Sequence, residues 1–98
     1  MSHEVVLIVL IQVQPGLGKQ QIQAFEKLAP LVRAEAGCLE YELHRVANNN
    51  DQFVLTERWT SAEALSAHDV SPHMLEADRL NPTFRAGPAT VLQLTSYR

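Results

Sequence analysis

The sequence predicts a single α+β domain of ferredoxin-like type, with the element order β-α-β-β-α-β. Three observations support this fold class: an apolar run over residues 5–11, two alternating segments at residues 38–46 and 52–59, and helical periodicity after the first and the third predicted strand. The 98 residues are the length of one domain, so we expect one unit over residues 1–98. The expected sheet is antiparallel, with the helices on one face.

The first predicted strand is apolar at every position from Val5 to Ile11. Such a strand must bury both of its sides. The helices can cover only one face of the sheet, which leaves the other face bare. A second copy of the chain is the simplest cover, because most oligomers are symmetric homo-oligomers. The sequence therefore predicts a homodimer that pairs through the sheet face.

Residues 17–36 follow a helical pattern. Apolar side chains recur every three or four positions on one face, and Glu35 belongs to the polar face. The apolar positions are Ile22, Phe25, Ala29, Val32 and Ala36. Pro30 is expected to kink or split this helix, because proline lacks the backbone N–H and clashes with the preceding turn. Gly37 is a natural stop at its end.

The next two segments predict a hairpin around the turn at residues 48–51. In the segment 38–46, alternation places one set of side chains on each face. The apolar set is Leu39, Tyr41 and Leu43, and the polar set is Glu40, Glu42 and His44. In the segment 52–59, Glu57 shares its face with apolar neighbours, namely Phe53, Leu55 and Trp59.

The second helical region is expected in two pieces. Thr60 followed by Glu63 forms a capping box for the first piece. Ser71 and Pro72 start the second piece, because serine favours the N-cap and proline the first helical position. The last strand is expected over residues 89–97, after an irregular connection.

Composition excludes several classes of function. The formal charge of −3, without any run of lysine and arginine, argues against a nucleic-acid partner. The lone cysteine, Cys38, allows neither an intrachain disulfide nor a multi-cysteine zinc site. No apolar run is long enough to span a bilayer, and the first residues lack the basic region of a signal peptide. We therefore expect a cytoplasmic protein without a membrane partner and without a cofactor.

An ordered set of motifs resembles one family. Residues 37–44 read Gly-Cys-Leu-Glu-Tyr-Glu-Leu-His, residues 57–59 read Glu-Arg-Trp, and residues 63–65 read Glu-Ala-Leu, with His68 and His73 beyond. This set resembles the antibiotic biosynthesis monooxygenase (ABM) family over nearly the whole chain. The resemblance implies a dimeric α+β barrel with a pocket in each subunit. It also implies a cofactor-independent monooxygenase that acts on a quinol-like or phenolic small molecule.

The same family includes other functions, so alternatives stay open. One is an isomerase of a small phosphorylated ketone of the quorum-signal type, which needs cations near the pocket. The candidate cations are Arg45, Arg58, Arg79 and Arg85. Another is a dimeric binding or stress-response protein without catalysis. Haem degradation does not fit, because His68 and Asp78 stand where the haem-degrading relatives carry Trp and His, and the first strand has no Asn.

Glu57 and His68 are the candidate catalytic residues. Glu57 lies on an apolar strand face, where a carboxylate is either a base or anchor with a raised pKa or a partner in a structural ion pair. His68 continues the apolar stripe that contains Leu65, where a core or helix-end role is the alternative. If the helix folds back over the strand, both side chains reach one pocket. His68 would then accept a substrate proton while Glu57 orients the imidazole.

Trp59, Tyr41 and His73 are the candidate substrate-binding residues. For Trp59 and Tyr41 the alternative is packing in a thin core. His73 lies in the first turn of the restarted helix, near the expected pocket rim. A metal site from His68, Asp69 and His73 is not predicted, because these residues lie on different helical pieces at no recognised spacing.

Overall fold

The computed structural model describes residues 3–97; residues 1, 2 and 98 of the expected domain lie outside this range. Its elements alternate as the sequence predicts, which confirms the α+β ferredoxin-like fold class. In chain order they are β1 (Val5–Gln12), α1 (Gly18–Arg33), β2 (Cys38–Arg45), β3 (Gln52–Trp59), α2 (Ala62–Asp69), α3 (Pro72–Leu80), the short 3-10 helix η1 (Asn81–Thr83) and β4 (Thr90–Leu94).

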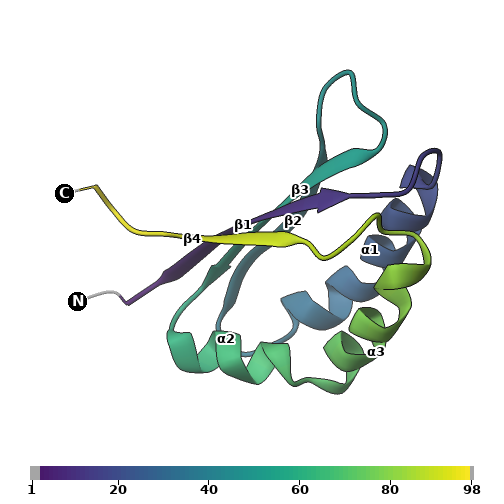
Figure 1. Ribbon diagram of the computed structural model, residues 1–98. Helices are drawn as coiled ribbons and strands as arrows, with labels where there is room; N and C mark the ends of the chain where they lie inside the picture. Colours follow the sequence, from purple (N-terminus) through teal and green to yellow (C-terminus); the bar gives the residue numbers. More distant parts are fainter. Residues whose placement is uncertain (1–2, 98) are drawn as a thin grey trace.

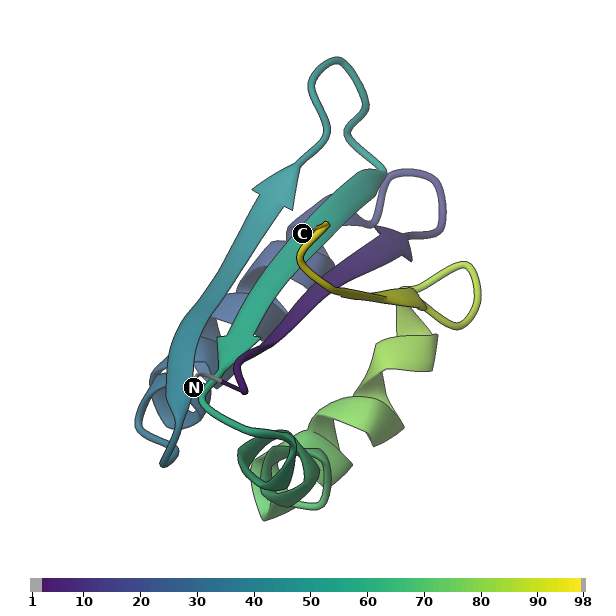
Figure 2. The same ribbon diagram turned by 90° about the vertical axis from the view of Figure 1, so that its left-hand side faces the viewer.

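The four strands form one sheet in the order β2-β3-β1-β4. Each neighbouring pair is antiparallel. The helices lie together on one side of this sheet, as Figures 1 and 2 show. Within the described residues, none of the helices combines the length and the apolar character that a bilayer crossing requires.

Between the sheet and the helices lies the hydrophobic core. Along β1 the side chains alternate: Val5, Leu7, Val9 and Ile11 are buried, whereas the residues between them are half-buried or exposed. The remaining buried apolar residues are Val13, Ala29, Val32, Tyr41, Phe53, Leu55, Trp59 and Phe84. The predicted inward face of β3, which includes Glu57, is buried at each of its positions.

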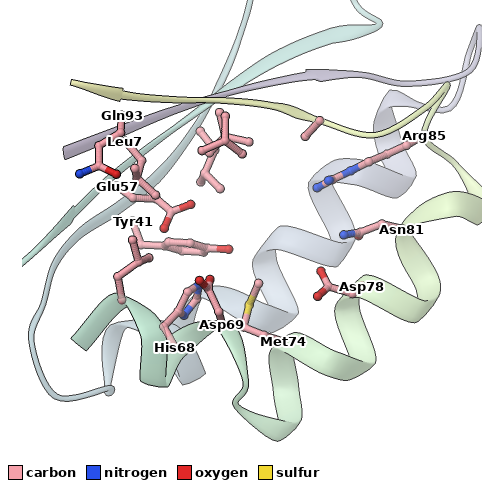
Figure 3. A pocket seen from close by; sticks show the side chains of 15 residues that line it. Leu7, Tyr41, Glu57, His68, Asp69, Met74, Asp78, Asn81, Arg85 and Gln93 are labelled. Atoms are coloured by element: carbon pink, nitrogen blue, oxygen red, sulfur yellow. The ribbon is translucent and has the colours of Figure 1, made fainter. Parts of the chain in front are cut away.

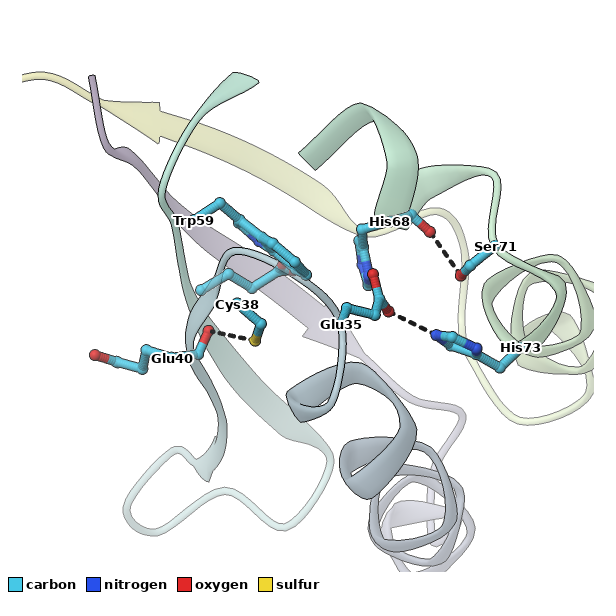
Figure 4. Close-up of polar contacts among 8 residues, drawn as sticks. Glu35, Cys38, Glu40, Trp59, His68, Ser71 and His73 are labelled. Atoms are coloured by element: carbon cyan, nitrogen blue, oxygen red, sulfur yellow. Dashed lines mark hydrogen bonds and ion pairs between the residues drawn. The ribbon is translucent and has the colours of Figure 1, made fainter. Parts of the chain in front are cut away.

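The structure corrects the prediction for α1 in two respects. Pro30 does not split the helix, which runs unbroken from Gly18 to Arg33. Pro30 removes one helical hydrogen bond, and because it lies in the last turn, any bend that it introduces affects only the few residues that follow. The helix also ends before Glu35, so this residue is not on its polar face. The Glu35 N–H donates to the Val32 carbonyl at 2.9 Å. The Glu35 carboxylate points toward His68 at the end of α2 and His73 at the start of α3 (Figure 4).

A β-bulge corrects the predicted alternation of β2. The register with β3 shifts between Cys38 and Glu40, so two residues of β2 span a single step of β3. The bulge turns Leu39 outward, where it is 44% exposed, and Cys38 packs against the core instead. The later inward positions, Tyr41 and Leu43, are as predicted.

The helix starts after β3 also differ in detail. Ser61, not Thr60, is the N-cap of α2, since its Oγ accepts a hydrogen bond from the Ala64 N–H at 3.1 Å. Ser71 is the N-cap of α3 as expected, but its Oγ donates to the His68 carbonyl at 2.8 Å and so joins the two helices. β4 is shorter than the predicted segment 89–97.

Candidate functional site

A cavity of 460 Å³ lies between the inner face of the sheet and helices α2 and α3. Its walls combine apolar side chains with a similar number of polar ones, and convergent polar groups in a concave pocket are typical of a small-molecule site. Figure 3 shows Glu57, Tyr41 and His68 at one end of this cavity, with Asn81 and Arg85 at the other. The lining residues are Leu7, Val9, Tyr41, Leu55, Glu57, Leu65, His68, Asp69, Met74, Asp78, Asn81, Arg85, Ala89, Val91 and Gln93.

The carboxyl group of Glu57 is buried at the sheet end of the cavity, with 5% of the residue exposed. Strand pairing places Glu57 opposite Leu7 of β1 and Tyr41 of β2. The Trp59 indole Nε1 donates a hydrogen bond of 3.0 Å to its Oε1. Burial raises the pKa of Glu57, and this Trp59 hydrogen bond only partly opposes the shift. Among residues 3–97, no arginine forms an ion pair with Glu57.

His68 lies at the end of α2 and is 2% exposed. Its Nδ1 is 2.9 Å from Glu35 Oε2 and 3.1 Å from Glu35 Oε1. The Trp59 ring packs on the imidazole with 4.5 Å between ring centroids, and the Tyr41 ring meets it edge-on at 5.9 Å. His68 lines the cavity, and with Nδ1 committed to Glu35, Nε2 is the ring nitrogen left for a ligand.

Tyr41 extends from β2 into the cavity (Figure 3). The side chain is buried, and the Phe25 ring stacks on it with 5.7 Å between centroids. Burial, followed by the nearby charge of Glu57, raises the pKa of the phenol. Tyr41 therefore offers a neutral hydroxyl, which can donate a hydrogen bond to a ligand anion.

The opposite end of the cavity is polar and contains a cation. Arg85 follows η1, and its Nε donates to Oε1 of the buried Gln21 at 3.0 Å. Burial lowers the pKa of the Arg85 guanidinium, although arginine keeps its charge under all ordinary conditions. Asn81 and Asp78 lie beside it on the cavity wall (Figure 3). This end can bind a polar or anionic substituent of a ligand.

The structure brings three of the five predicted site residues to one cavity: Glu57, His68 and Tyr41. Trp59 does not line the cavity. It is fully buried and supports two residues that do, through a hydrogen bond to Glu57 and ring packing on His68. His73 also lies outside the lining, with its Nε2 2.6 Å from Glu35 Oε2.

Glu35 is the residue that sequence reasoning missed. It, and not Glu57, is hydrogen-bonded to the imidazole of His68. If the helix continued through Ala36, Glu35 would lie on its solvent face. In the structure α1 ends at Arg33, so Glu35 lies in the connection that follows and can turn toward His68. The stop signal at Gly37 does not mark the end at Arg33, because it is equally compatible with a helix that continues to Ala36.

The model of a known family matches residues 4–80, and its description is "Antibiotic biosynthesis monooxygenase". The chain belongs to the antibiotic biosynthesis monooxygenase family. Membership of the ABM family supports a monooxygenase-like function in general terms. A search of proteins with curated functions finds no match to this sequence.

Solved structures share the ABM fold over the whole chain. PA3566 from Pseudomonas aeruginosa is 31% identical with a TM-score of 0.90, and the match covers 100% of this chain and 98% of that one. Rv0793 from Mycobacterium tuberculosis is 27% identical with a TM-score of 0.87, over 97% and 96% of the two chains. A protein from Nitrosomonas europaea, at 20% identity and a TM-score of 0.91, shares the fold over 99% and 93%.

Proposed function

We propose that this protein is a cofactor-independent monooxygenase that oxidises a phenol or quinol bound in the 460 Å³ cavity. The observation that carries the proposal is the convergence of Glu57, Tyr41 and His68 on one end of a cavity whose other walls are partly apolar and partly polar. An electron-rich phenol needs only deprotonation and exclusion of water before it can pass electrons to O2. The residues at this end supply a base, two hydrogen-bonding groups and burial.

In the proposed reaction, Nε2 of His68 accepts the proton of the substrate hydroxyl. The Glu35 carboxylate, at 2.9 Å from Nδ1, holds the ring in the tautomer with the proton on Nδ1 and stabilises the imidazolium that forms. The Tyr41 hydroxyl donates to the developing phenolate. Glu57, with Oε1 held by Trp59, presents its second oxygen to a polar group on the substrate ring.

The overall reaction is balanced without any added reductant. A phenol and one O2 give a quinone and one water: one oxygen atom enters the ring and the other leaves as water. The four electrons that reduce O2 come from the substrate. A quinol is converted in the same way to a hydroxyquinone.

The direct test is oxygen uptake with a panel of quinols and phenols and no added cofactor. We expect uptake by the native protein and a decrease in kcat of roughly a hundredfold or more for His68→Asn, the usual range for loss of a general base. Glu57→Gln should also lower the rate. His44→Asn is the matched control, because His44 is an exposed histidine on β2 whose side chain, within residues 3–97, is hydrogen-bonded to Thr56 alone. Absence of uptake with every compound, or equal rates for His68→Asn and His44→Asn, contradicts the proposal.

A second candidate function, isomerisation of a small phosphorylated ketone, is favoured by Arg85. Its half-buried guanidinium lines the cavity and could bind a phosphate, while His68 moves a proton at the other end. Proton exchange into the ketone, followed by NMR in deuterated water, would detect this activity without any oxygen uptake. Arg85→Gln should then raise KM more than it lowers kcat.

We also propose a homodimer through the sheet face away from the helices. Five of the outward positions of β1 and β4 are apolar, and Gln12 and Thr90 at one end of the two strands are polar. The apolar positions are Val6, Ile8, Leu10, Leu92 and Leu94. Leu10, Leu92 and Leu94 are 40%, 45% and 45% exposed in the single chain. Exposure of contiguous apolar side chains on a sheet is typical of an interface.

A further inference from the structure

One cluster of side chains includes a histidine that has no role in the proposed reaction. Glu35 from the α1–β2 connection, His68 from the end of α2 and His73 from the first turn of α3 meet behind the cavity (Figure 4). One ligand atom from each of the three residues lies within 4.8 Å of the others. His68 is 2% exposed at its side chain, and Glu35 and His73 are 15% and 21% exposed.

The two imidazoles converge on a single carboxylate oxygen. Oε2 of Glu35 is 2.9 Å from Nδ1 of His68 and 2.6 Å from Nε2 of His73. A proton-transfer role for His68 requires only the contact between His68 and Glu35. The contact between His73 and Glu35 has no part in that role and needs another explanation. Two nitrogen ligands and one oxygen ligand around one point, at low exposure, are instead the ligand set that zinc prefers.

The spacing of these atoms is also close to that of a metal site. Zinc lies about 2.0–2.1 Å from imidazole nitrogen and carboxylate oxygen in tetrahedral sites, so its ligand atoms are about 3.3 Å apart. The two nitrogen-to-oxygen distances are within about 0.7 Å of that spacing. An ion that enters between the three atoms would push them apart slightly. His73 is partly exposed, so the fourth ligand would be a water that reaches the ion from that side.

The positions of His68 and Glu35 are fixed by their surroundings. The Trp59 ring packs on the His68 imidazole, and the Ser71 hydroxyl holds the His68 carbonyl at 2.8 Å. Gly37 places the chain that follows Glu35 against α2, because a Cβ there would lie 2.6 Å from Ala64 Cβ. Such supporting contacts orient ligands and strengthen metal binding.

We propose that Glu35, His68 and His73 form a binding site for a divalent transition-metal ion, with Zn²⁺ as the best match. Each neutral imidazole moves its proton to the other ring nitrogen when the metal binds, so His68 coordinates through Nδ1 and carries its proton on Nε2. In that state Nε2 cannot accept a proton from a ligand in the cavity. This last consequence rests on the proposed function: the metal is an inhibitor of proton transfer by His68.

Metal binding is measured first, without any substrate. Metal-free protein is titrated with Co²⁺, whose visible absorption is intense in four-coordinate sites, and then with Zn²⁺ in competition. We expect one ion per chain and at least a tenfold loss of affinity in His73→Ala and in Glu35→Gln. His44→Ala is the control with the same histidine count, since His44 lies on the exposed side of β2 and should bind Co²⁺ like the native protein.

Two outcomes would overturn the site: no saturable Co²⁺ binding at micromolar concentration, or equal binding by native protein and His73→Ala. Circular dichroism of each variant shows whether it folds. The His73→Ala variant is the decisive one, because His73 is the most exposed of the three ligands and its replacement should disturb the fold least. Oxygen uptake with and without Zn²⁺ then tests the inhibition. Stoichiometric binding with no uptake of oxygen by any substrate refutes the proposed function and leaves the metal site standing.

Discussion

At the scale of single residues, burial of one carboxyl group links the stability of this protein to pH. Burial raises the pKa of Glu57 above its ordinary value of 4.5 in the folded chain. In the pH window between 4.5 and the raised value, the folded state keeps a proton that the unfolded state has lost. The free energy of unfolding must therefore fall as pH rises through this window.

Glu57→Gln should remove this decrease, because the amide does not titrate and can still accept the Trp59 hydrogen bond. We expect the native protein to lose stability relative to Glu57→Gln as the pH rises from 4 to 8. Urea unfolding at a fixed protein concentration measures the difference. Glu26→Gln, an exposed position on α1, is the control and should retain the native slope. A native slope in Glu57→Gln would assign the pH dependence to another group.

Residue-scale prediction from sequence succeeded where periodicity alone decides the surroundings. The alternation of β3 places Glu57 among apolar neighbours, and the structure finds it buried there. The partner of His68 could not be predicted from the sequence, because Glu35 is 33 positions away and lies in a turn whose geometry depends on where α1 ends. Helix ends depend on local capping and tertiary contacts, which an apolar pattern does not specify.

At the scale of elements, the connection from α1 to β2 sets the position of the Glu35 carboxylate. Gly37 has a φ of 86°, which disfavours any side chain. A Cβ at this position would also lie 2.6 Å from Ala64 Cβ and from Thr60 Oγ1. The Gly37 carbonyl accepts a hydrogen bond of 2.9 Å from the Thr60 N–H, so this turn and the start of α2 are packed as one unit.

Gly37→Ala should destabilise the protein by about 2–4 kcal/mol, from backbone strain of about 1–2 kcal/mol and a similar cost of overpacking. Gly16→Ala is a matched control, since Gly16 has a φ of 83° but no atom within 4 Å of the added Cβ. It should lose only the strain energy. The urea midpoints of both variants give the comparison, and equal losses would mean that the close approach to α2 costs nothing.

Element boundaries show where sequence patterns reach their limit. The bounds of β3 agree with the prediction, because alternation and flanking turn residues mark both of its ends. The bulge between Cys38 and Glu40 was not predictable, since one extra residue in a strand leaves the local composition unchanged and only reverses the side on which Leu39 lies.

At the scale of the whole molecule, the proposed dimer follows from the two faces of the sheet. The helices cover the inner face (Figure 2). The outer face presents apolar side chains from β1 and β4. Leu92 pairs with Ile8 at the middle of the β1–β4 register, on the edge strand of the sheet. In a symmetric dimer a single substitution there acts twice, once from each subunit.

Leu92→Glu should therefore dissociate the dimer. Burying an unpaired charge costs about 3–5 kcal/mol, which raises the dissociation constant by roughly a hundredfold or more. Light scattering at micromolar concentration should give twice the 11.0 kDa chain mass for the native protein and a lower mass for Leu92→Glu. Leu75→Glu is the control, because Leu75 is 56% exposed on α3, in the helical layer, and should leave the mass unchanged. A native mass near that of one chain, or an undiminished mass for Leu92→Glu, would rule out pairing through this face.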